Sequence, residues 1–245
     1  MLPAKHSAHD FKKLMERWQA VSKHARLAGV PLGDANGLPV WGLETKSAAD
    51  GESAIYLSAG VHGDEAAGPW ALIEWAESNL PRLKTEPFLL VPCFNPVGFT
   101  HNTRVDGEGL DMNRRFHSRK ARHMTLWTQW LKARYIRLGV CLHEDYDALG
   151  CYVYELTASI SRADRALKET EMIIPRDPRR TIEGMAAKRG VIQRERIPKG
   201  IKGPEALVLT KLGCESTLTF ETPSELALGL RVAAQKRFLE AVCGV

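Results

Sequence analysis

The chain has 245 residues, of which 44% are hydrophobic and 26% charged, so it can bury one large core or two small ones. It has no run of 18 or more apolar residues, which argues against a membrane span, and its first ten residues lack the apolar segment of a secretory signal. The five cysteines are odd in number and show no C-x-x-C spacing, which is typical of reduced thiols in a cytoplasmic protein.

The net charge is +5, and much of the basic excess lies between Arg162 and Lys202. This segment contains no aromatic residue and no helix-turn-helix, zinc-finger or RNA-binding signature, so we expect no nucleic-acid partner. Two interpretations stay open for the basic 176–202 stretch. It is either a solvated surface or a field that attracts an anionic substrate.

Hydrophobic spacing and turn residues predict the elements of the first half of the chain. In order, these are a helix over 11–25 capped by Asp10, a turn-rich loop over 31–37, strands over 40–45 and 53–57, a helix over 69–80 and a buried strand over 88–94.

The same reasoning extends through the second half. It predicts a polar loop over 97–116, a helix around 124–131, strands over 136–142 and 151–156, a helix over 161–174, an irregular basic region over 175–204, a strand over 216–220 and a last helix capped by Ser224. Because strands alternate with helices, we expect residues 1–245 to form one α/β domain with helices on both faces of the sheet.

Polar side chains come at or just after the ends of four of the predicted strands. These residues are His62, Asn95, His143 and Glu221. Because open α/β sheets build their sites at the carboxyl edge of the strands, we expect these side chains to lie near one another.

The first candidate site is a possible metal centre. His62 and Glu65 lie three positions apart on a turn of small residues, where both can face one point. Alone, this spacing is also compatible with a surface salt bridge. With His143 added, two imidazoles and one carboxylate make a three-ligand zinc site with one open position, which is the arrangement of catalytic zinc.

Glu221 is the candidate general base, and its alternative is an exposed glutamate at a strand end. Between the two halves of the site lies a loop with Arg104, Arg114 and Arg115. A guanidinium group suits a carboxylate or a developing oxyanion, although a solvated charged loop would have the same composition.

Six short motifs resemble those of the zinc carboxypeptidases of the M14 type, and they occur in the same order along about residues 53–225. They are His62-Gly-Asp-Glu65, Asn95-Pro-Val-Gly98, Arg104, Asp111-Met-Asn-Arg114, His143 and Thr219-Phe-Glu221. The small bacterial murein-peptide amidase branch is the most similar. The aspartoacylase and succinylglutamate desuccinylase branch shares part of the pattern.

The resemblance implies one α/β domain with a mixed eight-stranded sheet and a role for each matching residue. One Zn²⁺ per chain would be held by His62, Glu65 and His143, and Glu221 would activate the zinc-bound water and later protonate the leaving amine. Arg104 would stabilise the oxyanion. Asn113 and Arg114 would hold the substrate's terminal carboxylate, and Asp111 would fix the tautomer of His62.

Two departures from the family pattern bear on the substrate. The peptidases carry a tyrosine on a loop before the catalytic glutamate, whereas this chain has no tyrosine after Tyr154. His143 is followed by Glu144-Asp145-Tyr146, an acidic neighbourhood that could raise the basicity of the site or bind a cationic group.

We therefore expect zinc-dependent hydrolysis of an amide bond next to a free carboxylate, in a peptide or a muropeptide-like fragment. The first alternative is an N-acyl amino acid deacylase of the aspartoacylase or desuccinylase kind. The second is a binding protein without enzymatic activity that uses the basic 176–202 segment to contact a partner. No membrane partner is expected, and the sequence leaves the oligomeric state and the side-chain and stereochemical preference open.

Overall fold

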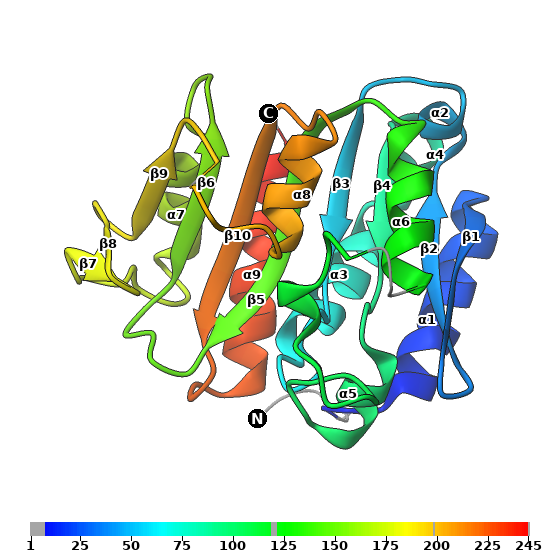
Figure 1. Ribbon diagram of the computed structural model, residues 1–245, viewed down its shortest axis with the longest axis horizontal. Helices are drawn as coiled ribbons and strands as arrows, with labels where there is room; N and C mark the ends of the chain where they lie inside the picture. The colour runs from blue at the N-terminus through cyan, green and yellow to red at the C-terminus, as the bar shows by residue number, and fades with distance from the viewer. Residues whose placement is uncertain (1–7, 119–121, 198, 245) are drawn as a thin grey trace.

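The computed structural model describes residues 8–118, 122–197 and 199–244 (Figure 1). The helices are α1 (Phe11–Ala25), α2 (Lys46–Ala49), α3 (Ala67–Ser78), α4 (Leu80–Thr85), α5 (Pro96–His101), α6 (Arg122–Lys132), α7 (Ala163–Thr170), α8 (Glu205–Lys211) and α9 (Leu228–Cys243), with a 3₁₀ turn at Met112–Arg114. The strands are β1 (Ala28–Ala35), β2 (Leu38–Glu44), β3 (Ala54–Ser58), β4 (Phe88–Val91), β5 (Ile136–Asp145), β6 (Tyr152–Thr157), β7 (Thr181–Ile182), β8 (Met185–Ala186), β9 (Val191–Arg194) and β10 (Ser216–Pro223).

Eight strands form one mixed sheet in the order β1-β2-β4-β3-β5-β10-β6-β9. The four central strands β4, β3, β5 and β10 are parallel, and antiparallel pairing joins β2 to β4 and β6 to β10. The strands β7 and β8 form a separate hairpin. The predicted single α/β domain with a mixed eight-stranded sheet is therefore confirmed.

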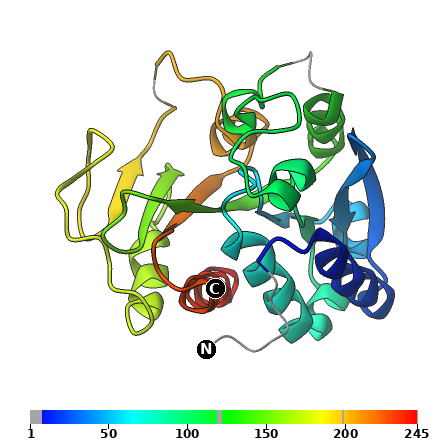
Figure 2. The ribbon, with the colours of Figure 1, turned by 90° about the horizontal axis from the view of Figure 1, so that it is seen from below.

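Helices cover both faces of this sheet (Figure 2). One face carries α1, α3, α7 and α9 over one hydrophobic cluster, and the other carries α6 and α8 over a second cluster. Every residue of β3 and β4 is buried, as expected of central parallel strands covered on both sides. No helix in the described part of the chain is long and apolar enough to cross a bilayer.

Helix α9 fixes the strand that carries Glu221. Its Phe238 ring stacks on the ring of Phe220 with centroids 4.1 Å apart and planes 2° from parallel. Neighbouring residues of a strand point to opposite faces of the sheet. Because Phe220 points to the face covered by α9, Glu221 points to the other face.

The structure differs from the sequence prediction mainly at the edges and ends of the sheet. Residues 31–37 belong largely to the edge strand β1, which tolerates proline and a bulge between Pro31 and Gly33. The region 175–204, predicted as irregular, supplies the hairpin and the edge strand β9. The last helix begins after Ala227 rather than at Ser224.

The two strands that carry His143 and Glu221 extend beyond their predicted ends. β5 continues to Asp145 and β10 to Pro223, and they pair residue by residue up to those positions. Both side chains therefore lie within strands rather than just past them. The hydrophobic pattern stops earlier because most of the added residues are polar.

The basic segment is partly neutralised by ion pairs at the surface. Arg176 contacts Asp164 and Glu171, and the Arg179 guanidinium lies 2.6 Å from the Asp177 carboxylate. This pairing favours the interpretation of a solvated surface. The five cysteines are all buried and free, as predicted. Met1 to Ser7, on which the expectation of no secretory signal partly rests, lie outside the described residues.

Candidate metal and catalytic site

The loop that follows β3 carries the first two candidate ligands. It passes so close to α5 that a Cβ atom on Gly63 would lie 1.9 Å from the carbonyl carbon of Gly98. Asn95 holds α5 in place, since its Oδ1 accepts from the N–H of Gly98 at 2.8 Å and its Nδ2 donates to the carbonyl of Val105 at 3.1 Å. Asn95 therefore has a structural role under the site, and the two glycines are required by backbone packing.

His62, Glu65 and His143 converge on one buried point. The Nδ1 atom of His62 lies 2.5 Å from Oε1 of Glu65, and Nδ1 of His143 lies 2.8 Å from Oε2. One ligand atom from each residue lies within 4.8 Å of the others. Each residue is at most 4% exposed, so water competes little for these atoms.

Neighbouring side chains hold the ring of His62 and the backbone of His143. Nε2 of His62 lies 3.2 Å from Oδ1 of Asp111, which leaves Nδ1 for the centre of the site. The backbone carbonyl of His143 accepts from Nε2 of Gln235 at 3.0 Å. Asp111, to which the family resemblance gives the role of fixing the His62 tautomer, thus lies within hydrogen-bond distance of that ring.

The electrostatics of this cluster favour a cation. Burial opposes the charged form of Glu65, but His143 and His62 overcome it and lower its pKa to about 2. Burial likewise disfavours the charged form of His62, yet Glu65 and Asp111 raise its pKa to about 9. The cluster holds a buried carboxylate that needs positive charge, and two imidazoles with one carboxylate are the donor set that Zn²⁺ takes. The residues fit the ion.

Glu221 lies next to this cluster on the neighbouring strand. Its Cα is paired in register with that of His143, and its side chain lines a cavity of about 760 Å³ together with His62 and Glu65. Burial raises the pKa of Glu221 well above its usual range, and the negative charge of Glu65 adds to the effect while His143 opposes it. A carboxylate with a raised pKa beside a cation site is suited to accept and return a proton.

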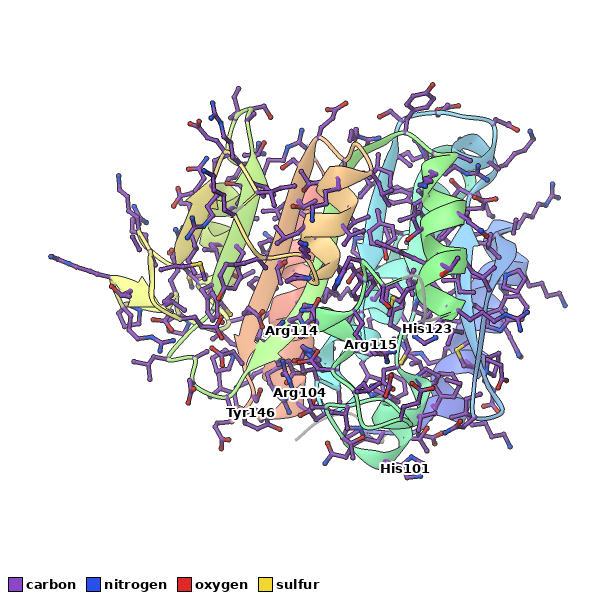
Figure 3. All side chains as sticks on the ribbon, viewed as in Figure 1. His101, Arg104, Arg114, Arg115, His123 and Tyr146 are labelled. Carbon is purple, nitrogen blue, oxygen red and sulfur yellow. The ribbon has the colours of Figure 1, made fainter. Side chains whose placement is uncertain are left out.

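The loop from Asn102 to Phe116 separates its arginines into two groups. Arg104 and Arg114 line the cavity near the end of β5, while Arg115 points elsewhere and lies 3.5 Å from both Asp106 and Glu108 (Figure 3). Arg104 also approaches Glu65 at 3.5 Å and Asp111 at 3.3 Å. Only two of the three arginines are therefore available to a substrate.

Asn113 lines the cavity and is fixed by α8. Its Oδ1 accepts from the N–H of Glu205 at 3.0 Å, which leaves the Nδ2 donor for a ligand. Gly203 packs on the backbone of Arg114, where a Cβ atom would lie 2.3 Å from the carbonyl oxygen. The start of α8 therefore sets the position of the Asn113-Arg114 turn.

The acidic residues after His143 are already occupied. Glu144 accepts from the N–H of Ala67 at 2.5 Å and pairs with Arg231, so it anchors α3 and α9. Asp145 accepts from the hydroxyl of Tyr152 at 2.9 Å. Tyr146, the next residue, is 58% exposed (Figure 3).

Sequence reasoning missed the side chains that line the far wall of the cavity. β10 contributes Thr217 and Thr219 on the face of Glu221, and β6 contributes Tyr152 and Tyr154 opposite them. The period-two alternation of β10 could have identified the threonines. Nothing in the local pattern connects the tyrosines with Glu221, because the pairing spans more than sixty residues.

Comparison with known proteins places this geometry in context. The family model of the succinylglutamate desuccinylase/aspartoacylase catalytic domain matches residues 52–144, and no curated protein matches the chain. An inferred metallopeptidase from Shewanella amazonensis SB2B has 20% identity and a TM-score of 0.86, covering 97% of this chain and 93% of that one. A metallo-carboxypeptidase from Burkholderia cenocepacia has 15% identity and a TM-score of 0.70, covering 95% and 68%.

A third structure is the metallo-carboxypeptidase from Pseudomonas aeruginosa in complex with (2-guanidinoethylmercapto)succinic acid. It has 17% identity and a TM-score of 0.63, and covers 94% of this chain and 68% of that one. These comparisons confirm the predicted resemblance, as a fold shared with carboxypeptidases and a match to the desuccinylase and aspartoacylase model. The narrower resemblance to the murein-peptide amidase branch stays a prediction.

The cluster predicts one high-affinity zinc site per chain. Metal content after dialysis against zinc should approach one equivalent, and His62→Ala or His143→Ala should reduce it to background. His101→Ala is the matched control, since this exposed histidine lies on α5 and its Nδ1 lies 2.9 Å from the carbonyl oxygen of Val97. Full zinc occupancy of both ligand variants, measured by atomic emission, would refute the assignment.

Proposed function

We propose that the protein is a zinc-dependent amidohydrolase of the carboxypeptidase type, which cleaves an amide bond next to a free carboxylate. One observation carries this proposal. The buried His62–Glu65–His143 cluster lies beside Glu221 in register, and Asn113, Arg104 and Arg114 line the same cavity. A metal cluster alone would fit many reactions, but a buried carboxylate next to it and guanidinium groups across from it fit hydrolysis of a carboxylate-bearing amide.

A zinc ion held by the three ligands would supply a Lewis acid that polarises the carbonyl and acidifies water. Glu221 then removes one proton from the attacking water as its oxygen bonds to the carbonyl carbon. The same residue returns this proton to the leaving nitrogen when the C–N bond breaks, so the products are a carboxylic acid and an amine.

The arginines divide the remaining work. Arg104 stands beside Glu65, where it donates to the carbonyl oxygen as negative charge develops there. Asn113 and Arg114 bind the free carboxylate, because the Nδ2 donor of Asn113 and the guanidinium fork of Arg114 both line the cavity. Together they orient the scissile bond toward Glu221.

A second candidate is hydrolysis of an N-acyl amino acid. The match of the desuccinylase and aspartoacylase model to residues 52–144 favours it, since these residues include both candidate ligands of the first loop and His143. The structural likeness to carboxypeptidases over almost the whole chain favours the peptide substrate. Both candidate reactions use the same residues. They differ in the group on the acyl side of the scissile bond, which is a peptide in one case and a small acyl group in the other.

A substrate panel separates the two candidates. We expect the zinc-loaded protein to hydrolyse short peptides with a free terminal carboxylate faster than N-acetyl-aspartate and N-succinyl-glutamate. Peptides with an amidated terminus should be poor substrates because Arg114 and Asn113 lose their partner. Faster release of acetate or succinate than of amino acid from any peptide, followed by chromatography, would favour the deacylase.

Glu221→Gln removes the proton acceptor while preserving the shape of the side chain. Turnover should fall by roughly 10²–10⁴-fold, the usual contribution of general acid–base catalysis, with zinc content unchanged. Glu225→Gln, at an exposed glutamate on the same segment, is the control and should behave as the parent. Parent-like turnover of Glu221→Gln would exclude it as the base.

Arg114→Lys keeps the positive charge but removes the bidentate fork. We expect KM for a peptide with a free carboxylate to rise about tenfold with a smaller change in kcat. Arg115→Lys changes a neighbouring arginine that faces Asp106 and Glu108 instead of the cavity, and should leave KM unaltered. Equal effects of the two substitutions in steady-state kinetics would contradict the assignment.

A further inference from the structure

Two carboxylates that line the cavity, Asp145 at the end of β5 and Glu183 in the β7–β8 hairpin, are each bound by a tyrosine of β6. The hydroxyl of Tyr152 donates to Asp145 at 2.9 Å, and the hydroxyl of Tyr154 donates to Glu183 at 2.7 Å. The two rings lie edge to face with centroids 5.5 Å apart. All four residues line the cavity. Carboxylates beside aromatic rings are a favourable environment for an organic cation.

Of these two carboxylates, only Glu183 is available to a ligand. Asp145 uses its other oxygen, Oδ1, to accept from the N–H of Asp147 at 3.0 Å, so both of its oxygens have partners. For Glu183, the described residues provide one hydrogen bond, from Tyr154, and no lysine or arginine within ion-pair distance. Its second oxygen is therefore free to accept from a substrate.

The backbone conformation of the β7–β8 turn determines where Glu183 lies. Glu183 and Gly184 form the two-residue turn between β7 and β8, with φ angles of +46° and +73°. Turns with two positive φ angles favour asparagine, aspartate and glycine, so a glutamate at the first position is disfavoured by the turn itself. Backbone strain of this kind is concentrated at functional sites, and here it brings a carboxylate to Tyr154.

The register of β6 and β10 places the two tyrosines next to Glu221 and the residues that precede it. Tyr152 pairs with Glu221, and Tyr154 pairs with Thr219, which is two residues earlier on the same face of β10. Arg104 and Arg114 lie on the opposite side, toward β5, whereas the hairpin lies beyond β6 (Figures 1 and 3). Close to Glu221, the cavity thus has the guanidinium groups of Arg104 and Arg114 on one side and the carboxylate of Glu183 on the other.

We propose that Glu183, oriented by Tyr154, selects a leaving residue with a cationic side chain, an ammonium or a guanidinium group. The terminal carboxylate of that residue binds Asn113 and Arg114, and its side chain extends along Thr219 to the Tyr154–Glu183 pair. This assignment rests on the proposed amide hydrolysis and specifies its substrate class.

Arg194 provides the competing prediction. It also lines the cavity, and it pairs with Leu156, one step farther from Glu221 than Tyr154. If Arg194 rather than Glu183 bound the side chain of the leaving residue, the protein would prefer an acidic leaving residue. The greater distance from Glu221 and the free oxygen of Glu183 favour the cationic substrate.

The test compares three acyl-dipeptides that share one acyl group and end in lysine, norleucine or glutamate. The zinc-loaded protein should cleave the lysine peptide with a kcat/KM at least tenfold above that of the norleucine peptide. Glu183→Gln should abolish this ratio, and Glu195→Gln, at an exposed glutamate outside the cavity, should preserve it. Arg194→Gln should also leave the lysine-to-norleucine ratio intact.

Binding of the products gives a readout that does not depend on turnover. Calorimetry should show free lysine binding at least tenfold tighter than norleucine to the zinc-loaded parent, but not to Glu183→Gln. This result with no hydrolysis of any peptide would refute the proposed function and support the side-chain assignment. Hydrolysis with equal rates for lysine and norleucine, or a preference for glutamate that Arg194→Gln removes, would overturn the assignment alone.

Discussion

The structure depends on one buried carboxylate. Glu65 is 4% exposed and lies between the Nδ1 atoms of two histidines, in a region where an uncompensated negative charge would be costly. The surrounding groups contact either this carboxylate or the histidines beside it. The two imidazoles face it, Asp111 supports His62 from behind, and Arg104 approaches from the cavity. A site that balances one carboxylate with two imidazoles is already arranged for a divalent cation.

Several distant segments hold this arrangement in place through backbone packing. The Gly63 loop lies directly on Gly98, and α5 is fixed there by the Asn95 side chain. On the other side of the cavity, Gly203 packs on the backbone of Arg114 and the N–H of Glu205 binds the Asn113 side chain. The motif residues between the ligands are therefore explained by close contact and capping as much as by chemistry.

Charges of opposite sign line the cavity on the two sides of Glu221. The guanidinium groups of Arg104 and Arg114 come from the loop that precedes α6, and the carboxylate of Glu183, bound by Tyr154, comes from the hairpin beyond β6. This polarity follows from the sheet order, since β10 lies between β5 and β6 and carries Glu221 into the middle. A substrate that fills both sides carries a carboxylate at one end and a cation at the other, which connects the proposed reaction with the proposed specificity.

The sequence by itself indicated the α/β fold class and supplied the residues of a candidate metal and catalytic site. Long amphipathic and continuous apolar runs identified α1, α3, β3 and β4. His62, His143 and Glu221 were chosen from their places at or after strand ends, and Glu65 from its spacing of three residues from His62. Edge strands β1 and β9 escaped notice because one exposed edge and proline or charged residues remove the alternation that marks a strand. Composition and spacing alone did not separate the loop arginines, and only the family resemblance gave a role to Arg114 and none to Arg115. In the structure, packing places Arg114 at the cavity and Arg115 beside Asp106. Tyr154 and Glu183 likewise belong to the site only through the pairing of β6 with β10 and the turn of a hairpin. Contacts of this kind depend on long-range register, which a local pattern of residues does not encode.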